Sequence, residues 1–483
     1  MSKLSIRKSL AYSFLDRYAS LVIGIISSML IARLLTPEEI GVFSVTMVLL
    51  TFVATVRDLG AGQYLIQEKD LTYEKLRAVW AVQLGLGFGL AAVVSLISHP
   101  ISQFYAEPRI GDVMLVIAIN YLVNPFGSMT YAWLMREMQF EKVALMRFSS
   151  SLIGVIISGW LAWKNFGPIS LAVGALASTS LNALIAVYFR PKWFPWMPGF
   201  TGIRGVLKFG SQLTGSSIVN VISSSAPDLL LGKLQGLISA GLFSRALGLV
   251  HMFYRLFVDA VGAVCLPWFA KHSREHGDLS EPFLRATAYV TALGWSFCIG
   301  IICLAHPIIR TLYGFQWDHA VDLARLLAIA TAFSVPASLC PTALLSAGAV
   351  SVIARVSVLC ALQTILLVAI GASQSMMSVG IAMILAAGVS SAIWLRTSSK
   401  RLGFSLEAFF NAVVKSAVVA MLSGIGPLFA FFKYGAYPDE RAAPIVLGCA
   451  LGLMGFVGGI LMVRHPLKDE LTTLLAKLIS RTN

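Results

Sequence analysis

Charged residues are scarce in this sequence, and their scarcity excludes an ordinary soluble fold. Asp, Glu, Lys and Arg make up 12% of the 483 residues, and 57% are hydrophobic. Soluble domains contain roughly 25% charged residues. Apolar stretches of about 18 to 25 residues recur along nearly the whole chain, and each is long enough to cross a bilayer core as a helix. They are too long and too uniformly apolar for barrel strands, so the sequence predicts an all-α polytopic membrane protein.

Motifs that would indicate an enzyme are also absent from the sequence. We find no Walker motif, no Ser-His-Asp spacing and no pair of carboxylates on a long polar loop. The glycine run at residues 85–89 lies within an apolar stretch and has no P-loop lysine, so it predicts close helix packing rather than nucleotide binding. The same reading holds for Gly448/Gly452 and Gly455/Gly459. We expect no enzymatic activity.

Cysteine and histidine give no sign of a disulfide framework or a metal site. The six cysteines all lie in apolar stretches without a CxxC pair, where cysteine behaves as a small hydrophobic residue. His272 and His276 would share one helix face, but a third ligand is missing and no glutamate occupies the HExxH position. We therefore expect no metal and no cofactor.

Fourteen apolar stretches are candidate membrane crossings, and the basic residues orient them. Their centres lie near residues 22, 48, 87, 122, 153, 178, 217, 248, 294, 333, 361, 386, 421 and 453. With the N-terminus in the cytoplasm, most of the 37 Lys and Arg residues fall on the cytoplasmic side, as the positive-inside rule requires. The sequence predicts a multi-pass membrane protein with both termini in the cytoplasm. The net charge of +14 is scattered over short loops, which favours membrane lipids over nucleic acid as its partner.

An internal repeat divides the chain. Residues 33–44 resemble residues 233–244 at a shift of 200, and Gly41 corresponds to Gly241. An even number of crossings separates the copies, so the repeat is parallel. The predicted divisions are an N-terminal six-helix lobe (1–190), a linker rich in proline and tryptophan (191–204), a C-terminal six-helix lobe (205–397), two additional helices (398–464) and a cytoplasmic tail (465–483).

Ionisable residues within or at the ends of the apolar stretches are the candidate site residues. Each costs roughly 2.5–3.5 kcal/mol at a helix centre, so such residues face water, a ligand or each other unless they snorkel to the headgroups. The cations proposed to hold a substrate anion are Arg17, Arg57, Arg245 and Arg255. The carboxylates proposed to bind a coupling ion are Asp228, Asp16, Asp58 and Asp259. Asp228 has an equal alternative, which is a structural ion pair with Lys233 or Arg245.

Prolines within the apolar stretches predict points where helices bend. Pro125, Pro227 and Pro336 would interrupt their helices and free backbone groups. Pro125 and Pro336 occupy matching places in the two halves of the repeat. Bending at matched places suits a transporter that alternates between two openings.

Three segments carry a resemblance to a known family. ARLLTPEEIGVFSV (residues 32–45), GVLKFGSQL (205–213) and DLLLGKLQGLISAGLFSRA (228–246) are similar to the oligosaccharide flippases of the multidrug/oligosaccharidyl-lipid/polysaccharide exporter superfamily. The resemblance covers at least residues 8–397. It implies two six-helix lobes around a central cavity and, in branches with fourteen spans, a groove for the polyprenyl tail at the last two helices. The chain departs from the peptidoglycan-precursor branch because its first span has one clear arginine, Arg17.

The resemblance implies a flippase for a polyprenyl diphosphate-linked oligosaccharide used in exopolysaccharide, capsule or O-antigen synthesis. Guanidinium groups fit phosphate oxygens in a bidentate fashion, and no nucleotide site is present, which leaves a proton or sodium gradient as the energy source. Partners would be the polysaccharide polymerase and the chain-length machinery. The alternatives are a cation-coupled drug antiporter of the same superfamily and a membrane polymerase or ligase for the same sugars. The second alternative would require a long external loop with basic and acidic residues.

Overall fold

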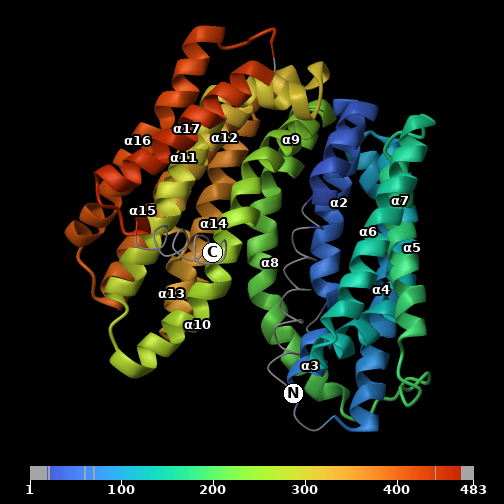
Figure 1. Ribbon diagram of the computed structural model, residues 1–483. Coiled ribbons are helices and arrows are strands. Elements are labelled where there is room, and N and C mark those ends of the chain that lie inside the picture. The colour runs from blue at the N-terminus through green and yellow to red at the C-terminus, as the bar shows by residue number, and fades with distance from the viewer. Residues whose placement is uncertain (1–18, 20–21, 59–60, 69–70, 441, 469–483) are drawn as a thin grey trace, which may run out of the picture. The chain divides into compact units, whose positions relative to one another are not determined.

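The computed structural model describes residues 19, 22–58, 61–68, 71–440 and 442–468, and this part of the chain is helical without β-strands (Figure 1). A short helix, Val22–Leu34, comes first. The helices and helical turns that follow are α2 (Pro37–Asp58), α3 (Ala61–Gln67), α4 (Tyr73–Tyr105), α5 (Pro108–Arg136), α6 (Phe140–Trp163), α7 (Ile169–Tyr188), α8 (Ile203–Leu234), α9 (Leu237–Phe253), η1 (Tyr254–Val258), α10 (Asp259–His276), α11 (Ser280–Leu312), η2 (Phe315–Ala320), α12 (Val321–Ser334), η3 (Val335–Ala337), α13 (Cys340–Ser346), α14 (Val350–Ala372), α15 (Met376–Leu402), α16 (Leu406–Tyr434) and α17 (Ala442–Met462).

Twelve helical segments among the described residues are long and apolar enough to span a membrane. They confirm twelve of the fourteen predicted crossings. The crossing predicted near residue 22 coincides with Val22–Leu34, whose described part is shorter than a span. The crossing predicted near residue 217 coincides with the 32-residue helix α8. The membrane fold is therefore confirmed, and the count of fourteen stays a prediction.

Residues 266–283 and 60–75 are too polar to span a membrane, and in the first of them Pro267, Trp268 and Phe269 followed by charged residues predict an amphipathic helix in the headgroup layer. The segment predicted at residues 266–283 is α10, which begins earlier, at Asp259, and ends at His276, where Gly277 takes a left-handed conformation with φ of 76°. The predicted range begins and ends too late in the sequence, because residues 280–283 already belong to α11, which begins at Ser280. Residues 60–75 contain the short helix α3. The predicted position of α10 in the headgroup layer stays a prediction.

Local sequence signals explain where the helices begin. Thr36 and Glu39 form a capping box, in which each backbone N–H donates to the other residue's side chain, at 2.8 Å and 3.3 Å. Thr72, Ser375 and Ser405 cap α4, α15 and α16 with their side-chain oxygens. Each cap satisfies a donor that the helix itself leaves unpaired.

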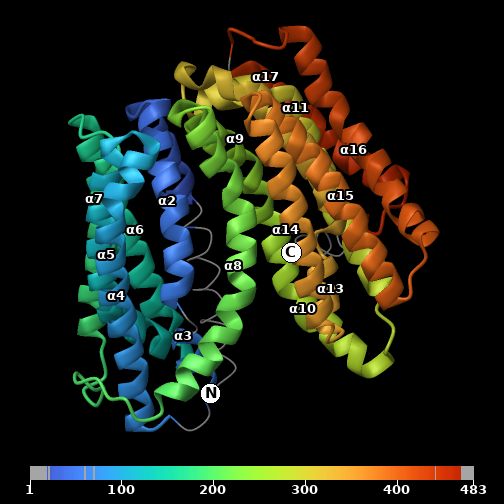
Figure 2. The ribbon, with the colours of Figure 1, turned by 180° about the vertical axis from the view of Figure 1, so that it is seen from behind.

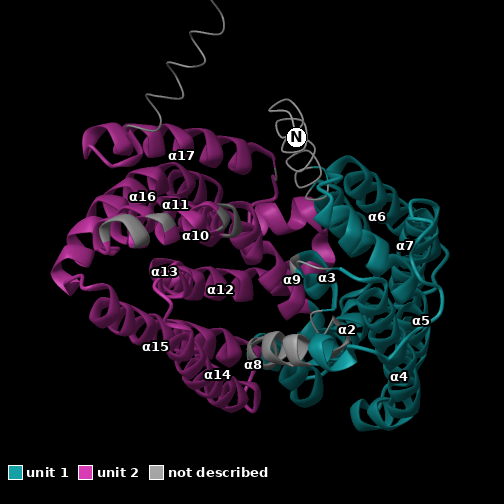
Figure 3. Cartoon of the chain, turned by 90° about the horizontal axis from the view of Figure 1, so that it is seen from below, with its two compact units in different colours: residues 1–241 teal, residues 242–483 magenta. Residues whose placement is uncertain are grey.

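The chain forms two compact units, Met1–Gly241 and Leu242–Asn483 (Figure 3). In unit 1, α5 packs against α4 and α7, α7 packs against α6, and α8 packs against α2 and α4. The predicted boundary between the lobes, at residues 191–204, comes before α8, whereas the boundary between the two units follows Gly241. The contacts place α8 with unit 1 because it packs on helices of that unit, and the transport lobes themselves stay a prediction.

In unit 2, α11, α16 and α17 pack together, while α12 packs against α15 and α15 against α14 (Figures 2 and 3). One apolar core lies among α10, α11, α13 and the end of α9, where Phe253, Phe269 and Phe283 are fully buried. The glycines Gly448, Gly452, Gly455 and Gly459 bring α17 against its neighbours. An added Cβ at Gly455 would lie 2.2 Å from the carbonyl oxygen of Leu422, so the predicted packing role of these glycines is confirmed.

The repeated motif meets its own copy. A Cβ on Gly41 of α2 would lie 1.8 Å from the carbonyl oxygen of Leu237, and a Cβ on Gly241 of α9 would lie 2.0 Å from the carbonyl oxygen of Pro37. Leu237 and Pro37 are themselves 200 residues apart, so the contact is reciprocal. The repeat that the sequence predicts thus coincides with a backbone-to-backbone contact between two helices.

The segment between α7 and α8 is held against α4 by hydrogen bonds. Trp80 of α4 donates its indole N–H to the carbonyl oxygen of Trp196 at 3.0 Å, and Arg77 donates to the carbonyl oxygens of Met197 and Pro198. The guanidinium of Arg190 lies 4.0 Å from the centre of the Trp196 ring. The predicted linker is therefore anchored to the first turns of α4.

His465 lies just beyond α17, and its hydrogen bonds link this segment to α16 and α11. The Leu467 N–H donates to its Nδ1 at 3.2 Å, so Nε2 carries the proton and donates to Ser416 Oγ at 3.1 Å. Ser416 Oγ in turn donates to the carbonyl oxygen of Ala288 at 2.9 Å. Burial, with the charge of Lys415, lowers the pKa of His465 to about 4.

The hydrogen bonds of His465 are expected to weaken in acid. Because the folded pKa of His465 lies below the unfolded value of about 6.5, its stabilisation is complete above pH 6.5 and is lost as the pH falls toward 4, by at most about 1.4 kcal/mol per pH unit. Hydrogen exchange of residues 463–468, corrected for intrinsic rates, should show opening that grows between pH 7 and 5. In His465→Gln the pH dependence should vanish; an identical dependence in that variant would contradict the assignment.

Candidate functional site

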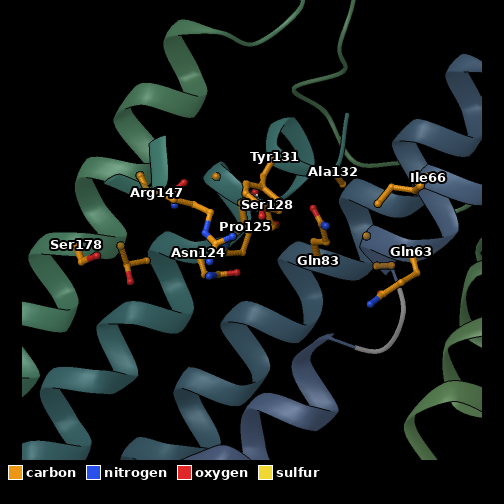
Figure 4. Close-up of a pocket in the computed structure, with 15 residues that line it drawn as sticks. Gln63, Ile66, Gln83, Asn124, Pro125, Ser128, Tyr131, Ala132, Arg147 and Ser178 are labelled. Carbon is orange, nitrogen blue, oxygen red and sulfur yellow. Dashed lines mark hydrogen bonds between the residues drawn. The ribbon is translucent and has the colours of Figure 1, made fainter. Parts of the chain in front are cut away.

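Unit 1 contains a polar pocket with a volume of about 520 Å³. It lies among α3, α4, α5, α6 and α7 (Figure 4). Ser178, Arg147 and Asn124 lie toward one end in this view, and Gln63 and Ile66 toward the other. The lining residues are Ala61, Gly62, Gln63, Ile66, Gln83, Asn124, Pro125, Gly127, Ser128, Tyr131, Ala132, Arg147, Ser178, Thr179 and Asn182.

The lining combines neutral polar groups with one cation. Four lining residues are carboxamides: Gln63, Gln83, Asn124 and Asn182. Four are hydroxyl residues: Ser128, Tyr131, Ser178 and Thr179. Arg147 is the only charged residue among the fifteen, and none of them is acidic. Because carboxamides both donate and accept hydrogen bonds, this surface suits a ligand with many hydroxyl groups.

Small residues allow the helices to approach one another around the pocket. A Cβ on Gly87 of α4 would lie 2.7 Å from Pro125 Cγ and from the carbonyl oxygen of Tyr121 in α5. A Cβ on Gly127 would lie 3.4 Å from Asn182 Oδ1 in α7. Of the glycine run predicted to serve helix packing, Gly87 therefore does so, and the pocket forms where α4, α5 and α7 converge.

Gln83 is the most unusual residue of the lining. Its side chain is 9% exposed, and no group among the described residues donates a hydrogen bond to its Oε1. A buried acceptor without a partner costs roughly 1–3 kcal/mol. The cost disappears when a water molecule or a ligand hydroxyl fills the pocket, so Gln83 indicates a site that is built to be occupied.

Asp228, on α8, is buried at 6% exposure. Its Oδ1 accepts a hydrogen bond from the Ser44 hydroxyl of α2 at 3.2 Å. The predicted alternative partner, Lys233, instead donates to the carbonyl oxygen of Phe104 and lies 4.1 Å from the centre of that ring. No salt bridge of Asp228 occurs within the described ranges.

The predicted cations differ in their surroundings. The guanidinium of Arg245, in unit 2, lies 5.8 Å from the centre of the Tyr313 ring and 5.7 Å from that of Trp317. Such contacts stabilise a cation through the ring faces. Arg255 lies in the π-helical turn η1 and is exposed. Turns of this type are frequent at functional sites.

The other predicted residues cannot be placed as side chains. Asp16 and Arg17 lie outside the described residues. Arg57 and Asp58 close α2, and Asp259 begins α10, but their side chains lie outside the described set. Of the predicted cations and carboxylates, those with described side chains are Asp228, Arg245 and Arg255, and none of these three lines the pocket of unit 1. The grouping of the predicted residues around a diphosphate or an ion stays a prediction.

The predicted hinge prolines occupy two kinds of position. Pro125 and Pro227 lie inside the continuous helices α5 and α8. Pro336 lies in the 3-10 turn η3, which separates α12 from α13. Pro125 also lines the pocket, so bending at this residue would change the shape of the pocket. Bending itself stays a prediction at all three.

An apolar groove of about 570 Å³ lies between α16 and α17 of unit 2. Its lining consists only of glycines and large apolar residues: Leu422, Ile425, Gly426, Phe429, Leu451, Gly455, Gly458, Gly459 and Met462. No polar side chain is present among these nine residues. The groove therefore suits a hydrocarbon chain and no polar group.

Comparison with known proteins relates the sequence of the chain to a family. The sequence model of a family described as "Polysaccharide biosynthesis protein" matches residues 30–322. The succinoglycan biosynthesis transport protein ExoT of Rhizobium meliloti (strain 1021) is 22% identical over 97% of this chain and 95% of its own length. The lipopolysaccharide biosynthesis protein WzxC of Escherichia coli (strain K12) is also 22% identical, over 64% of this chain and 63% of its own.

Two solved structures share the fold. The lipid II flippase MurJ in an inward closed conformation aligns with a TM-score of 0.77 over 94% of this chain and 98% of its own, at 15% identity. A multidrug resistance MATE transporter in an inward-facing conformation aligns with a TM-score of 0.64 over 80% of this chain and 94% of its own, at 13% identity. At such low identity these structures show the fold alone.

Proposed function

Because the chain belongs to the polysaccharide biosynthesis protein family, we propose that it is a flippase that moves a polyprenyl diphosphate-linked oligosaccharide across the membrane by alternating access. The observation that carries the proposal is the polar pocket of unit 1, which lies within a bundle of membrane-spanning helices. Sugar hydroxyls do not enter hydrocarbon without replacement hydrogen bonds. The carboxamides and hydroxyls of the pocket supply such bonds inside the bundle.

The apolar groove between α16 and α17 accommodates the polyprenyl tail in this proposal. Each buried methylene contributes about 0.8 kcal/mol, so a groove without polar side chains suits a long isoprenoid. The diphosphate would be held by Arg17, Arg57, Arg245 and Arg255, since guanidinium groups bind phosphate oxygens with paired hydrogen bonds.

The setting in the cell follows from the same proposal. The protein would lie in the bacterial inner membrane with both termini in the cytoplasm, in agreement with the distribution of its basic residues. It would deliver its substrate to a polymerase and to chain-length machinery. The names of the relatives, which include succinoglycan and lipopolysaccharide biosynthesis proteins, support a role in surface polysaccharide synthesis.

Deletion of the gene tests the function directly. The mutant is expected to lose a surface polysaccharide and to accumulate its lipid-linked precursor in the cytoplasmic leaflet, and the wild-type gene should restore export. A mutant that keeps its surface polysaccharide but becomes sensitive to drugs would show that the protein is an antiporter instead.

Energy coupling is proposed to use a proton or sodium gradient through Asp228. Its carboxylate is buried, faces the Ser44 hydroxyl and lies one residue after Pro227. Binding of a cation there would favour one conformation of α8 over another. Asp16, Asp58 and Asp259 are the next candidates.

The variant Asp228→Asn is expected to lose the stimulation of transport by an imposed gradient while it still binds substrate, because asparagine keeps the shape but cannot carry the charge. Flipping in proteoliposomes, with and without a proton or sodium gradient, measures this. Ser44→Ala serves as a milder comparison, since it removes only the hydrogen bond. A response to the gradient equal to that of the wild type in Asp228→Asn would move the coupling role elsewhere.

A further inference from the structure

The apolar groove between α16 and α17 of unit 2 has a cation at one end. Lys415 lies seven residues before Leu422, which lies seven before Phe429, and the last two line the groove. Residues seven apart share one face of a helix. Lys415 therefore continues the stripe that lines the groove, about 10 Å beyond Leu422 at 1.5 Å per residue. Its side chain is exposed.

Arg464 brings a second cation to the same end. The helices α16 and α17 lie side by side (Figure 1), and His465 Nε2 lies 3.1 Å from Ser416 Oγ. The residues that directly precede this pair are Arg464 and Lys415. Arg464 follows Met462, the last lining residue of α17, by two positions and is exposed. In the part of the chain that the structure describes, neither cation forms an ion pair.

The charges at the two ends of the groove differ. Lys415, Arg464 and Lys468 are the only Lys, Arg, Asp or Glu residues in the stretches 408–432 and 442–468. At the opposite end, the loop between α16 and α17 contains two carboxylates and one guanidinium at residues 439–441, and with Lys433 these charges cancel. A molecule with a long apolar tail and a phosphate head therefore fits the groove in one orientation, with its head toward Lys415 and Arg464.

The backbone of Arg464 separates its charge from its place in the fold. Its φ of 48° is left-handed, at the position just after α17 where glycine is usual. The His465 N–H donates to the carbonyl oxygen of Ile460 at 3.1 Å, which is the hydrogen bond of a Schellman helix end. Any residue other than glycine costs free energy in this conformation. Replacement by glycine would therefore relieve the backbone and remove the guanidinium at once.

We propose that this end of the groove is a loading site, where Lys415 and Arg464 bind the diphosphate of the lipid-linked substrate while its polyprenyl tail lies in the groove. The inference rests on the proposed function and names residues that receive the substrate before it reaches the cations predicted for transport. Two cations suit a head that carries more than one negative charge. The positive-inside rule predicts this end on the cytoplasmic side, where the substrate starts under the proposed function.

Equilibrium binding of bare undecaprenyl diphosphate to the full-length protein, in nanodiscs of zwitterionic lipid, is the first experiment. Lys415→Gln and Arg464→Gln should each weaken binding roughly tenfold, because a hydrogen bond between charged groups is worth about that factor. Undecaprenol has the same tail without phosphate and should bind the wild type and both variants equally. Lys400→Gln, on α15 and outside the groove lining, should leave both affinities unchanged. Wild-type affinity for the diphosphate in both groove variants would overturn the inference.

Arg464→Gly distinguishes recognition from folding. Its thermal stability should equal or exceed that of the wild type, because glycine adopts the left-handed conformation without a steric penalty. Its affinity for undecaprenyl diphosphate should nevertheless fall roughly tenfold, as in Arg464→Gln. A stable Arg464→Gly that binds the diphosphate as tightly as the wild type would contradict the role of the guanidinium.

A membrane phospholipid is the competing source of the same phosphate chemistry. Phosphatidylglycerol carries one negative charge and shorter tails, so at equal concentration in the nanodisc it should displace little undecaprenyl diphosphate. Displacement with equal affinity would show that the groove holds a membrane phospholipid instead of the substrate.

Transport distinguishes failure of this inference from failure of the proposed function. Proteoliposomes receive a polyprenyl diphosphate-linked disaccharide over a range of concentrations. Lys415→Gln and Arg464→Gln should flip it roughly tenfold more slowly than the wild type at low concentration and approach the wild-type rate at saturation, as expected when binding alone is weakened. If the wild type does not flip the substrate, the proposed function fails; if both variants match an active wild type at every concentration, only the inference fails.

Discussion

Replacement of Gly241 by alanine is expected to push residues 237–241 away from residues 37–41 within unit 1. The new Cβ would lie 2.0 Å from the carbonyl oxygen of Pro37, far inside van der Waals contact, and the obstacle is backbone that cannot rotate away. We expect a loss of about 3 kcal/mol or more, at the upper end of overpacked sites. The thermal stability of the purified protein and its transport activity should both fall, and Gly41→Ala should do the same.

The matched control is Gly248→Ala, on the same helix. A Cβ at Gly248 meets nothing within 4 Å, and alanine favours helix by about 1 kcal/mol over glycine. This variant should be as stable as the wild type or slightly more so. Wild-type stability in Gly241→Ala would contradict the reciprocal contact between the two copies of the repeat.

Gly458→Phe is expected to block transport without unfolding the protein. Gly458 lines the apolar groove between α16 and α17, and a Cβ there meets nothing within 4 Å. A phenyl ring would fill the space proposed for the polyprenyl tail. Displacement of only two methylenes costs about tenfold in affinity, at about 0.8 kcal/mol each, so flipping in proteoliposomes should fall at least that much.

Gly388→Phe, on α15, is the corresponding control, since a Cβ at Gly388 also meets open space and the residue does not line the groove. It should flip substrate at the wild-type rate. Gly455→Ala should instead lower stability, because its Cβ would lie 2.2 Å from the carbonyl oxygen of Leu422. If Gly458→Phe folds and transports normally, the tail lies elsewhere.

The membrane fold could be predicted from sequence because lipid imposes one simple rule. Every backbone polar group must find a partner within its own segment, so length and apolar composition suffice to find the helices. The repeat was also visible, since Gly41 and Gly241 recur with Phe43 and Phe243. That the two glycines touch each other could not be predicted, because a repeat in sequence does not state which surfaces meet.

The pocket of unit 1 escaped prediction for a physical reason. Charge predicts the other candidate residues, whereas the lining of this pocket is mostly neutral, and Gln83 is a single polar residue in an otherwise apolar stretch. Arg147 is one of the basic residues that the positive-inside rule predicts on the cytoplasmic side. The polar run at residues 178–182 was the available signal, since hydroxyl and carboxamide groups in a span need partners.

Asp228 and Arg245, which the sequence predicts as site residues because of their charge, lie among neighbours that the sequence does not predict. Asp228 is buried and hydrogen-bonded to Ser44 rather than paired with Lys233, and Arg245 lies against the Tyr313 and Trp317 rings. Sequence identified both as unusual but could not supply their neighbours, which come from helices far along the chain. Partners of a buried charge are set by tertiary packing.

The composition of the pocket lining has a consequence for how acidity affects the protein. None of the fifteen lining residues is Asp, Glu, His, Lys or Cys, so the lining offers no group that exchanges a proton near neutral pH. Sugar affinity should therefore stay level between pH 6 and 8 even if the transport rate does not. A proton gradient would have to act through another part of the chain, which leaves recognition of cargo and input of energy to separate sets of residues.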